Sequence, residues 1–239
     1  RGARVIISDS TVVNAAVRSV AGRTPVVFIS GADPVRLGWV QSLNKPGGNQ
    51  TGVFMLNTEL TQKRAELLIE AAPEMRALGL LGNAANTNIA VHRRAMEATA
   101  GTRRLKLHIF ALRSEFELEA AFQRVAESRP AGMVIQADPW LDSRADRIIA
   151  LAAKYELPSI FQWREQTEAG GLISYGVDLR LVYRAIGNLV GRILGGMPPS
   201  ELPVQQATKI ELIVNLRTAR ALRLKVAESV LVRADDLIE

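Results

Sequence analysis

The feature that most constrains the fold of this chain is a regular alternation of short aliphatic runs with helix-like segments. The segments between the runs place apolar residues three and four positions apart, as in Leu60, Leu67 and Leu68, opposite a charged face that holds Lys63 and Arg64. Strands that alternate with amphipathic helices pair in parallel through right-handed crossovers, so we expect an α/β fold with helices on both faces of two smaller sheets. The expected strands are residues 5–7, 26–29, 51–56, 78–81, 105–110, 133–135, 159–161, 172–175 and 210–214.

The same periodicity predicts helices over residues 11–20, 35–43 and 179–194, and one whose apolar face includes Phe116 and Phe122. Three glycines, Gly187, Gly191 and Gly195, share one face of the 179–194 helix, and we expect that face to permit close backbone packing. A domain boundary is expected at residues 57–59, and the Gly-Gly-Met-Pro-Pro stretch at 195–199 indicates a connection.

Ligands of open parallel sheets bind beyond the carboxyl ends of the strands, so the loops that follow the aliphatic runs are the informative ones. These loops are rich in polar and aromatic side chains, at residues 8–11, 30–34, 82–87, 136–140, 162–165 and 175–178. Trp140, Trp163 and Tyr175 either line a pocket for an apolar side chain or pack the lobes, and the sequence leaves both roles open.

Several polar residues in these loops have two readings. Ser10 and Thr11 begin the 11–20 helix, where they either cap it or help to bind a carboxylate or phosphate at its N-terminus. Asp33 and Asp138, each followed by proline, either cap the next segment or accept hydrogen bonds from a ligand ammonium.

Catalytic and cofactor motifs are not found. His92 and His108 have no acid or nucleophile at a motif spacing, and the chain has no phosphate-binding loop, dinucleotide fingerprint or paired-histidine metal motif. The absence of cysteine excludes disulfides and thiol catalysis. The missing motifs lead us to expect no metal and no cofactor. The basic residues behind the net charge of +6 are dispersed without interleaved aromatic residues, so we also expect no nucleic-acid partner.

Longer ordered motifs then point to a family. They include Asp33-Pro34-Val35, residues 42–53 (SLNKPGGNQTGV), residues 170–176 (GGLISYG), residues 202–206 (LPVQQ), residues 215–219 (NLRTA) and the closing LVRADDLIE at 231–239. In this order they resemble the TrpX-like group of bacterial ABC-transporter substrate-binding proteins across essentially the whole chain.

The resemblance implies a type I periplasmic-binding-protein fold with two Rossmann-like lobes that close on a small ligand. Lobe 1 would hold residues 1–57 and 177–205, and lobe 2 residues 58–176 and 206–239. The ligand, amino-acid-like and in some members aromatic, would be delivered to the permease subunits of an importer, in the periplasm or attached to the cell envelope of a bacterium.

The same resemblance implies roles for individual residues. Ser10 and Thr11 would hold the carboxylate of the ligand and Asp33 its ammonium group. The other lobe would contribute Asn83, Asp138, Trp163 and Tyr175.

The chain departs from the family pattern at its beginning, because members carry a leader and about two further βα units before the segment that matches Val5. We expect residues 5–8 to form an exposed sheet edge, and a homodimer through this edge near Val5 follows as a hypothesis.

Three functions compete at this point. The first is a solute receptor without catalytic activity, and the second is the ligand-sensing domain of a transcription regulator with the same fold. The third is an α/β enzyme that uses Asp33, Asp138 or Glu165, which suffers from the lack of an acid and base that the sequence places together.

Overall fold

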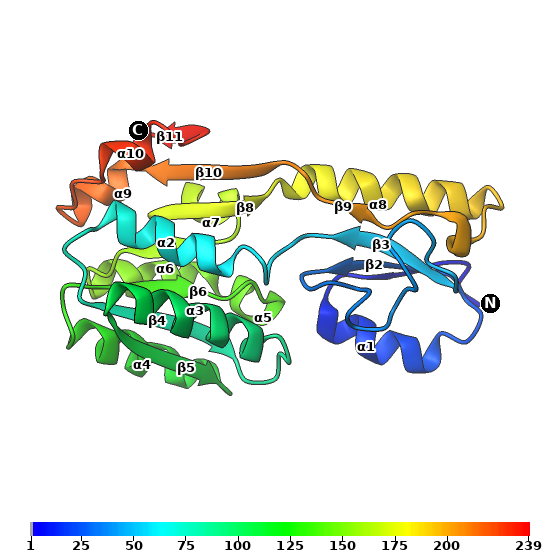
Figure 1. The fold of residues 1–239 in the computed structure, drawn as a ribbon, viewed down its shortest axis with the longest axis horizontal. Coiled ribbons are helices and arrows are strands. Elements are labelled where there is room, and N and C mark those ends of the chain that lie inside the picture. Colours follow the sequence, from blue (N-terminus) through cyan, green and yellow to red (C-terminus); the bar gives the residue numbers. More distant parts are fainter. Residues whose placement is uncertain (1) are drawn as a thin grey trace. The chain divides into compact units, whose positions relative to one another are not determined.

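The computed structural model describes residues 2–239, which divide into two compact units (Figure 1). The first unit holds the chain up to Asn57 together with Val177–Lys209, and the second holds Thr58–Gly176 together with Ile210–Glu239. The sequence interpretation places the last crossing after residue 205. In the structure the crossing follows Lys209, because a short strand, β9 (Gln205–Gln206), still pairs with β3 (Gln50–Phe54) of the first unit.

The first unit is built on a parallel sheet with the strand order β1-β2-β3-β9 among the described residues. All five residues of β2 are buried, as expected for a strand with neighbours on both sides. The remaining elements of this unit are β1 (Ile6–Ser8), α1 (Thr11–Val20), β2 (Val26–Ser30), α8 (Leu179–Leu194) and η2 (Pro199–Glu201).

The predicted helix over residues 35–43 is wrong. The chain makes turns there, and Gly38 adopts a φ of +66°, which no helix accommodates. Trp39 and Val40 are buried, and the Trp39 ring meets Phe28 edge-on at a centroid distance of 5.4 Å. The apolar spacing that looked helical therefore reflects a turn that folds back onto β2.

The second unit is built on a sheet with the strand order β11-β10-β8-β7-β6-β4-β5. Its elements are α2 (Thr61–Ala71), β4 (Ala77–Asn83), α3 (Ile89–Arg103), β5 (Lys106–Leu112), η1 (Glu115–Glu117), α4 (Leu118–Ala126), β6 (Ala131–Ile135), α5 (Pro139–Asp142), α6 (Ala145–Lys154), β7 (Ser159–Phe161), α7 (Arg164–Glu168), β8 (Ile173–Val177), β10 (Ile210–Asn215), α9 (Leu216–Ala221), α10 (Glu228–Leu231) and β11 (Asp236–Ile238).

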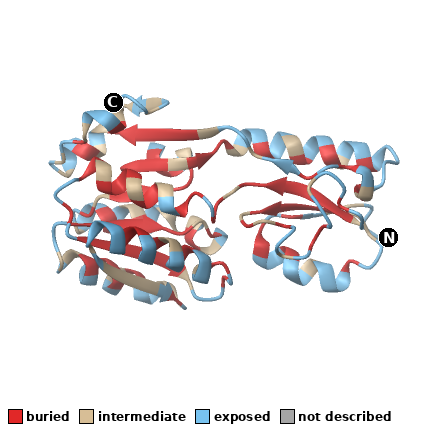
Figure 2. Cartoon of the chain, in the orientation of Figure 1, coloured by how far each residue is buried: buried red, intermediate tan, exposed pale blue. Residues whose placement is uncertain are grey.

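Both faces of this second sheet are buried (Figure 2). Along β4, Leu78 and Leu80 belong to the core on one face, whereas Ala77 and Leu81 belong to the core on the other. Because neighbouring side chains of a strand point to opposite faces, a strand covered on both sides needs a continuous apolar run. The α/β fold class is confirmed, and the aliphatic runs of the sequence are its strands.

Two strands of the second sheet, β10 and its parallel neighbour β11, run opposite to the other strands. The amide of Asn215, at the end of β10, donates to the carbonyl oxygen of Leu172, just before β8 begins, at 2.9 Å. The end of β10 therefore lies beside the start of β8, and the two strands are antiparallel. The segment between them runs through the first unit. It therefore does not act as a crossover over the second sheet, which would return the chain to the start of β8 and make β10 parallel to it.

Two further sequence predictions are wrong in detail. Phe116 lies in η1 with 84% of its surface exposed, because α4 begins only at Leu118. Apart from the backbone of α8 itself, no atom of the described chain lies within 4 Å of a Cβ built at Gly187 or Gly191, so the exposed glycine face of α8 does not pack closely against another element of the chain.

Candidate functional site

Polar side chains gather in the second unit where neighbouring strands β4, β6, β7 and β8 end. Asn83 is the last residue of β4, and Gln136 and Gln162 directly follow β6 and β7. These strands are adjacent in the sheet, and the pairs β4–β6, β6–β7 and β7–β8 are parallel, so their carboxyl ends meet at one edge. We call these residues, with Arg64, Asp138, Asp142, Trp163, Gln166, Ser174 and Tyr175, the polar cluster.

Asp138 joins the loops of the polar cluster. It is 2% exposed, and it caps α5 by accepting hydrogen bonds from the amides of Trp140 at 2.9 Å and Leu141 at 3.2 Å. The side-chain amide of Asn86 donates to Asp138 Oδ2 at 2.8 Å, and that of Asn83 donates to both carboxylate oxygens at 3.2 Å. Asp138 is thus a helix cap, as one reading of the sequence predicted, and the structure brings it together with Asn83.

Asp142, at the end of α5, was not singled out from the sequence. Trp163 donates its indole N–H to Asp142 Oδ2 at 3.0 Å, Gln166 donates to Oδ1 at 3.0 Å, and Gln162 also donates to Oδ1. Burial raises the pKa of Asp142 to about 7; these hydrogen bonds act to lower it, and the nearby Asp138 charge raises it further. Trp163 is itself 8% exposed, so its ring is packed within the unit while its polar edge holds the carboxyl group.

Arg64 is a second residue that the sequence interpretation missed. It lies on α2 with only 1% of its surface exposed, and its Nε donates to the carbonyl oxygen of Tyr175 at 2.7 Å. Burial lowers the pKa of Arg64 to about 10, and the negative charge of Asp142 opposes that shift. The guanidinium nevertheless stays charged at neutral pH, so the polar cluster contains a buried cation close to an acid that titrates near pH 7.

Several buried polar atoms of the cluster have no hydrogen-bond partner among residues 2–239. They are Gln136 Nε2, Gln162 Oε1 and Ser174 Oγ. The other end of the Gln136 side chain accepts from the backbone amide of Asn83 at 2.9 Å, and a Cβ at Gly82 would come within 2.7 Å of that same oxygen. Glycine at position 82 therefore makes room for the Gln136 side chain, whose Nε2 is left without a hydrogen-bond partner within the described chain.

In the first unit, Ser10 is the N-cap of α1 and accepts from the amide of Val13 at 3.2 Å, and Thr11 is the first residue of the helix. Both are buried. Asp33 accepts from the amide of Val35 at 2.8 Å and so holds a turn rather than the expected helix. The structure confirms the capping reading of Ser10, and it leaves the ligand roles of Ser10, Thr11 and Asp33 as predictions.

His92 has a hydrogen-bond partner that the sequence spacing did not show. Thr61 Oγ1 lies 2.5 Å from His92 Nδ1, which joins α2 to α3. Burial and the nearby charge of Arg64 lower the pKa of His92 to about 3, so the imidazole is neutral and a poor proton acceptor. Both side chains are at most 2% exposed, and the pair fits a packing role better than a catalytic one.

Among the described residues, no group of three or more potential metal-ligating side chains comes together. In the same part of the chain, every helix is too short or too polar to cross a bilayer.

Comparison with known proteins gives a family match over nearly the whole chain. The model of the family described as ABC transporter substrate binding protein matches residues 1–238. A curated relative, the tyrosine-binding protein of Clostridioides difficile (strain R20291), is 24% identical over 199 residues, or 83% of this chain. The chain spans 56% of the length of that relative.

Two solved structures have closely similar folds. A conserved domain protein from Vibrio cholerae has a TM-score of 0.86 and 25% identity, over 99% of this chain and 79% of its own. An ABC domain from Streptococcus pneumoniae, solved in complex with L-Trp, has a TM-score of 0.84 and 24% identity, over 100% of this chain and 80% of its own.

Proposed function

This chain belongs to the family of ABC transporter substrate-binding proteins, and on that premise we propose that it is a receptor for a small amino-acid-like ligand. In this proposal the receptor delivers its ligand to the permease subunits of an importer, in the periplasm or attached to the envelope of a bacterium, and it catalyses no reaction. The sensor domain of a transcription regulator has the same fold, but the family match favours the receptor.

The observation that supports this proposal most is the set of unpartnered buried atoms in the polar cluster, Gln136 Nε2, Gln162 Oε1 and Ser174 Oγ. Each buried polar atom without a partner costs about 1–3 kcal/mol. A polar ligand that hydrogen-bonds to them recovers this cost, whereas a unit that only needed to fold would gain from apolar residues at these positions.

The charges of the cluster suit a zwitterion. Arg64 can attract a carboxylate, and Asp138 and Asp142 can attract an ammonium group, although Arg64 already donates to Tyr175. The relatives named for tyrosine and solved with L-Trp make an aromatic amino acid the first ligand to test. In the first unit, Ser10, Thr11 and Asp33 remain the proposed contacts.

The test is calorimetric titration of the full chain with each of the twenty amino acids, followed by the Asp138→Asn variant. Asparagine keeps the helix cap but removes the charge, so we expect affinity for the best ligand to fall at least tenfold. The matched control is Asp146→Asn, which changes the same chemistry at an exposed position of α6 and should leave affinity unchanged. If no amino acid binds, or if both variants weaken binding equally, the proposed function is wrong.

We also propose that the edge of β1 pairs with a second copy of the chain. The supporting observations are that β1 ends the strand order of its sheet and that Ile7 is 56% exposed. The amide of Ile6 bonds to the carbonyl oxygen of Pro25, and because alternate residues of a parallel strand bond to the same neighbour, the amide of Ile7 points to the outer edge.

Light scattering at micromolar concentration tests this pairing. We expect a dimer, and we expect Ile7→Pro to give a monomer because proline removes an outward N–H without breaking the bonds from β1 to β2. The control is Val20→Lys, which changes another exposed apolar residue and should leave the dimer intact. Lysine is used there because proline would disrupt α1. A native chain that is monomeric under these conditions contradicts the proposed dimer.

A further inference from the structure

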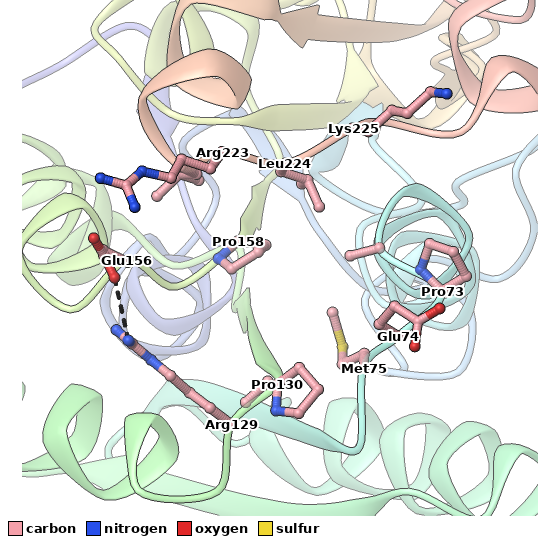
Figure 3. A pocket seen from close by; sticks show the side chains of 13 residues that line it. Pro73, Glu74, Met75, Arg129, Pro130, Glu156, Pro158, Arg223, Leu224 and Lys225 are labelled. Atoms are coloured by element: carbon pink, nitrogen blue, oxygen red, sulfur yellow. Dashed lines mark hydrogen bonds and ion pairs between the residues drawn. The ribbon is translucent and has the colours of Figure 1, made fainter.

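The second unit contains a cavity of about 590 Å³ that the polar cluster does not use (Figure 3). Its walls come from residues just before β4, β6 and β7 and from the loop between α9 and α10. These are the amino ends of the strands. The polar cluster lies at their carboxyl ends, which the five residues of β6 alone place about 16 Å away at roughly 3.3 Å per residue.

The interior of the cavity is apolar and its walls are stiff. Met75 and Leu224 point into the space in Figure 3, and Pro130 and Pro158 stand beside them. Proline has little conformational freedom, so we expect the walls at Pro130 and Pro158 to keep their shape when a ligand binds. Small-molecule sites are typically preformed and mostly apolar, with volumes of about 300–1,000 Å³, and this cavity falls in that range.

The rim of the cavity carries more positive than negative charge. Arg129 is neutralised by Glu156, with an Nη1–Oε2 distance of 3.2 Å (Figure 3). Among residues 2–239, neither Arg223 nor Lys225 makes an ion pair within 4.0 Å, and Glu74 is the other acid on the rim. Outside the Arg129–Glu156 pair, the rim therefore carries two cations, on opposite sides of the cavity, and one carboxylate, and this excess of positive charge favours an anionic ligand (Figure 3).

Backbone conformation sets two of the rim residues apart. Glu156 has a φ of +47° and Arg223 a φ of +51°, in the left-handed region that favours glycine. Each follows a helix, where glycine would avoid a cost of about 1 kcal/mol. Charged side chains stand at both positions and border the same cavity, which is consistent with a role for the side chains themselves.

From the volume, the apolar interior and the unpaired rim cations, we propose that this cavity is a second binding site, for a small molecule with a flat apolar body and one anionic group. The apolar body lies against Met75, Leu224 and the prolines, and the anion lies beside Arg223, while Lys225 on the opposite side of the cavity adds positive charge to the rim (Figure 3). This inference does not depend on the ligand proposed for the polar cluster.

The probe for the test is 8-anilinonaphthalene-1-sulfonate, an aromatic sulfonate whose fluorescence rises in apolar sites. We expect saturable binding with one site per chain, and at least tenfold weaker binding in the Arg223→Glu/Lys225→Glu variant. N-phenyl-1-naphthylamine has the same rings without the sulfonate, and its affinity should change less than threefold in that variant. If both probes respond alike, recognition of the anion is refuted.

Three matched variants complete the test. Arg217→Glu/Arg220→Glu makes the same charge change on exposed α9 outside the cavity, and equal weakening there would show that net charge alone controls binding. Asp138→Asn alters the polar cluster, and loss of probe binding in that variant would place the probe there and overturn the proposal. Arg223→Gly should weaken binding without lowering the melting temperature, because glycine suits the left-handed backbone; retained binding would remove Arg223 from the site.

Discussion

At the Asp142 carboxyl group, burial and hydrogen bonding act in opposite directions. Burial favours the protonated form, and the donors from Trp163, Gln162 and Gln166 favour the ionised form; the outcome is a pKa of about 7. The charge state of this group therefore changes within the ordinary working range of a protein, so the polar cluster gains a negative charge as the pH rises through neutrality.

This pKa predicts how stability varies with pH. Because the folded pKa lies above the usual value of 3.8, the folded state keeps a proton that the unfolded chain has released between these two values. The contribution of Asp142 to the free energy of unfolding should therefore fall as the pH rises from about 4 to about 7 and then level off. His92, whose folded pKa of about 3 lies below its usual value of 6.5, contributes in the opposite direction. The full shift at Asp142 corresponds to roughly 4 kcal/mol, and we expect about 2 kcal/mol because the carboxyl group is partly solvent-accessible.

Urea denaturation of the native chain and of Asp142→Asn between pH 4.5 and 8 measures this effect. The variant cannot titrate at this position but keeps His92, so the stability of the native chain minus that of Asp142→Asn should fall as the pH rises over this range. Asp146→Asn, exposed on α6, should keep the native pH dependence. Parallel curves for the native chain and Asp142→Asn would contradict a raised pKa.

Single residues also show which parts of the polar cluster the sequence predicted and which it missed. The loops at strand ends located Asn83, Asp138, Trp163 and Tyr175, since the carboxyl edge of a parallel sheet follows from the strand pattern. Arg64 was assigned to the charged face of α2, because helical periodicity treats a cation as solvent-facing and contains no information on a neighbouring polar cluster. Asp142 was missed because its partners, Trp163 and Gln166, are distant in sequence.

At the scale of elements, helix capping is the clearest link between the sequence and local stability. The Ser10 hydroxyl accepts from the amide of Val13 and satisfies one of the free donors at the start of α1. Ser10→Ala removes this bond, and we expect the free energy of unfolding to fall by about 1 kcal/mol. The measurement is urea denaturation followed by circular dichroism.

Ser19→Ala is the control within the same helix. The Ser19 hydroxyl donates to the carbonyl oxygen of Ala16 at the exposed end of α1, where water replaces the bond at little cost. An equal loss of stability in both variants would show that the Ser10 cap contributes no more to the free energy of unfolding than an exposed hydrogen bond does.

Elements with a strong local signal were predictable and the others were not. The helices at 11–20 and 179–194 were predicted with the bounds observed for α1 and α8, because each has a capping side chain before a long periodic segment. The failed helix at 35–43 has apolar spacing too, but its Trp39 packs onto Phe28 from a turn. The short strands β9 and β11 were missed because they form only beside a neighbouring strand.

At the scale of the whole molecule, neither unit is a continuous segment of chain. Residues 58–176 lack β10 and β11, and β10 supplies Leu212 and Val214 to the core that holds Leu78 and Leu80. Each large apolar side chain contributes about 1.5–3 kcal/mol when buried, and a domain is stable by only about 5–15 kcal/mol. Residues 58–176 alone should therefore fail to fold.

The expected remedy is a chain in which residues 58–176 are joined directly to residues 210–239 by a short Gly-Ser linker. A short linker suffices because the amide of Asp178 bonds to the carbonyl oxygen of Lys209, so the two ends to be joined are close. We expect this chain to unfold cooperatively in thermal denaturation followed by circular dichroism, and residues 58–176 alone to show no transition. Cooperative melting of the shorter piece would mean that β10 and β11 are dispensable.

The discontinuity of the two units also sets the order in which they mature on the ribosome. Residues 58–176 are synthesised early, yet their sheet must wait while Val177–Lys209, which complete the first unit, leave the exit tunnel. During that interval the edge of β8 that β10 will pair with stays open, and nascent chains in this state are prone to aggregation. The open edge of β8 is therefore a part of the nascent chain that needs a chaperone until β10 has been synthesised.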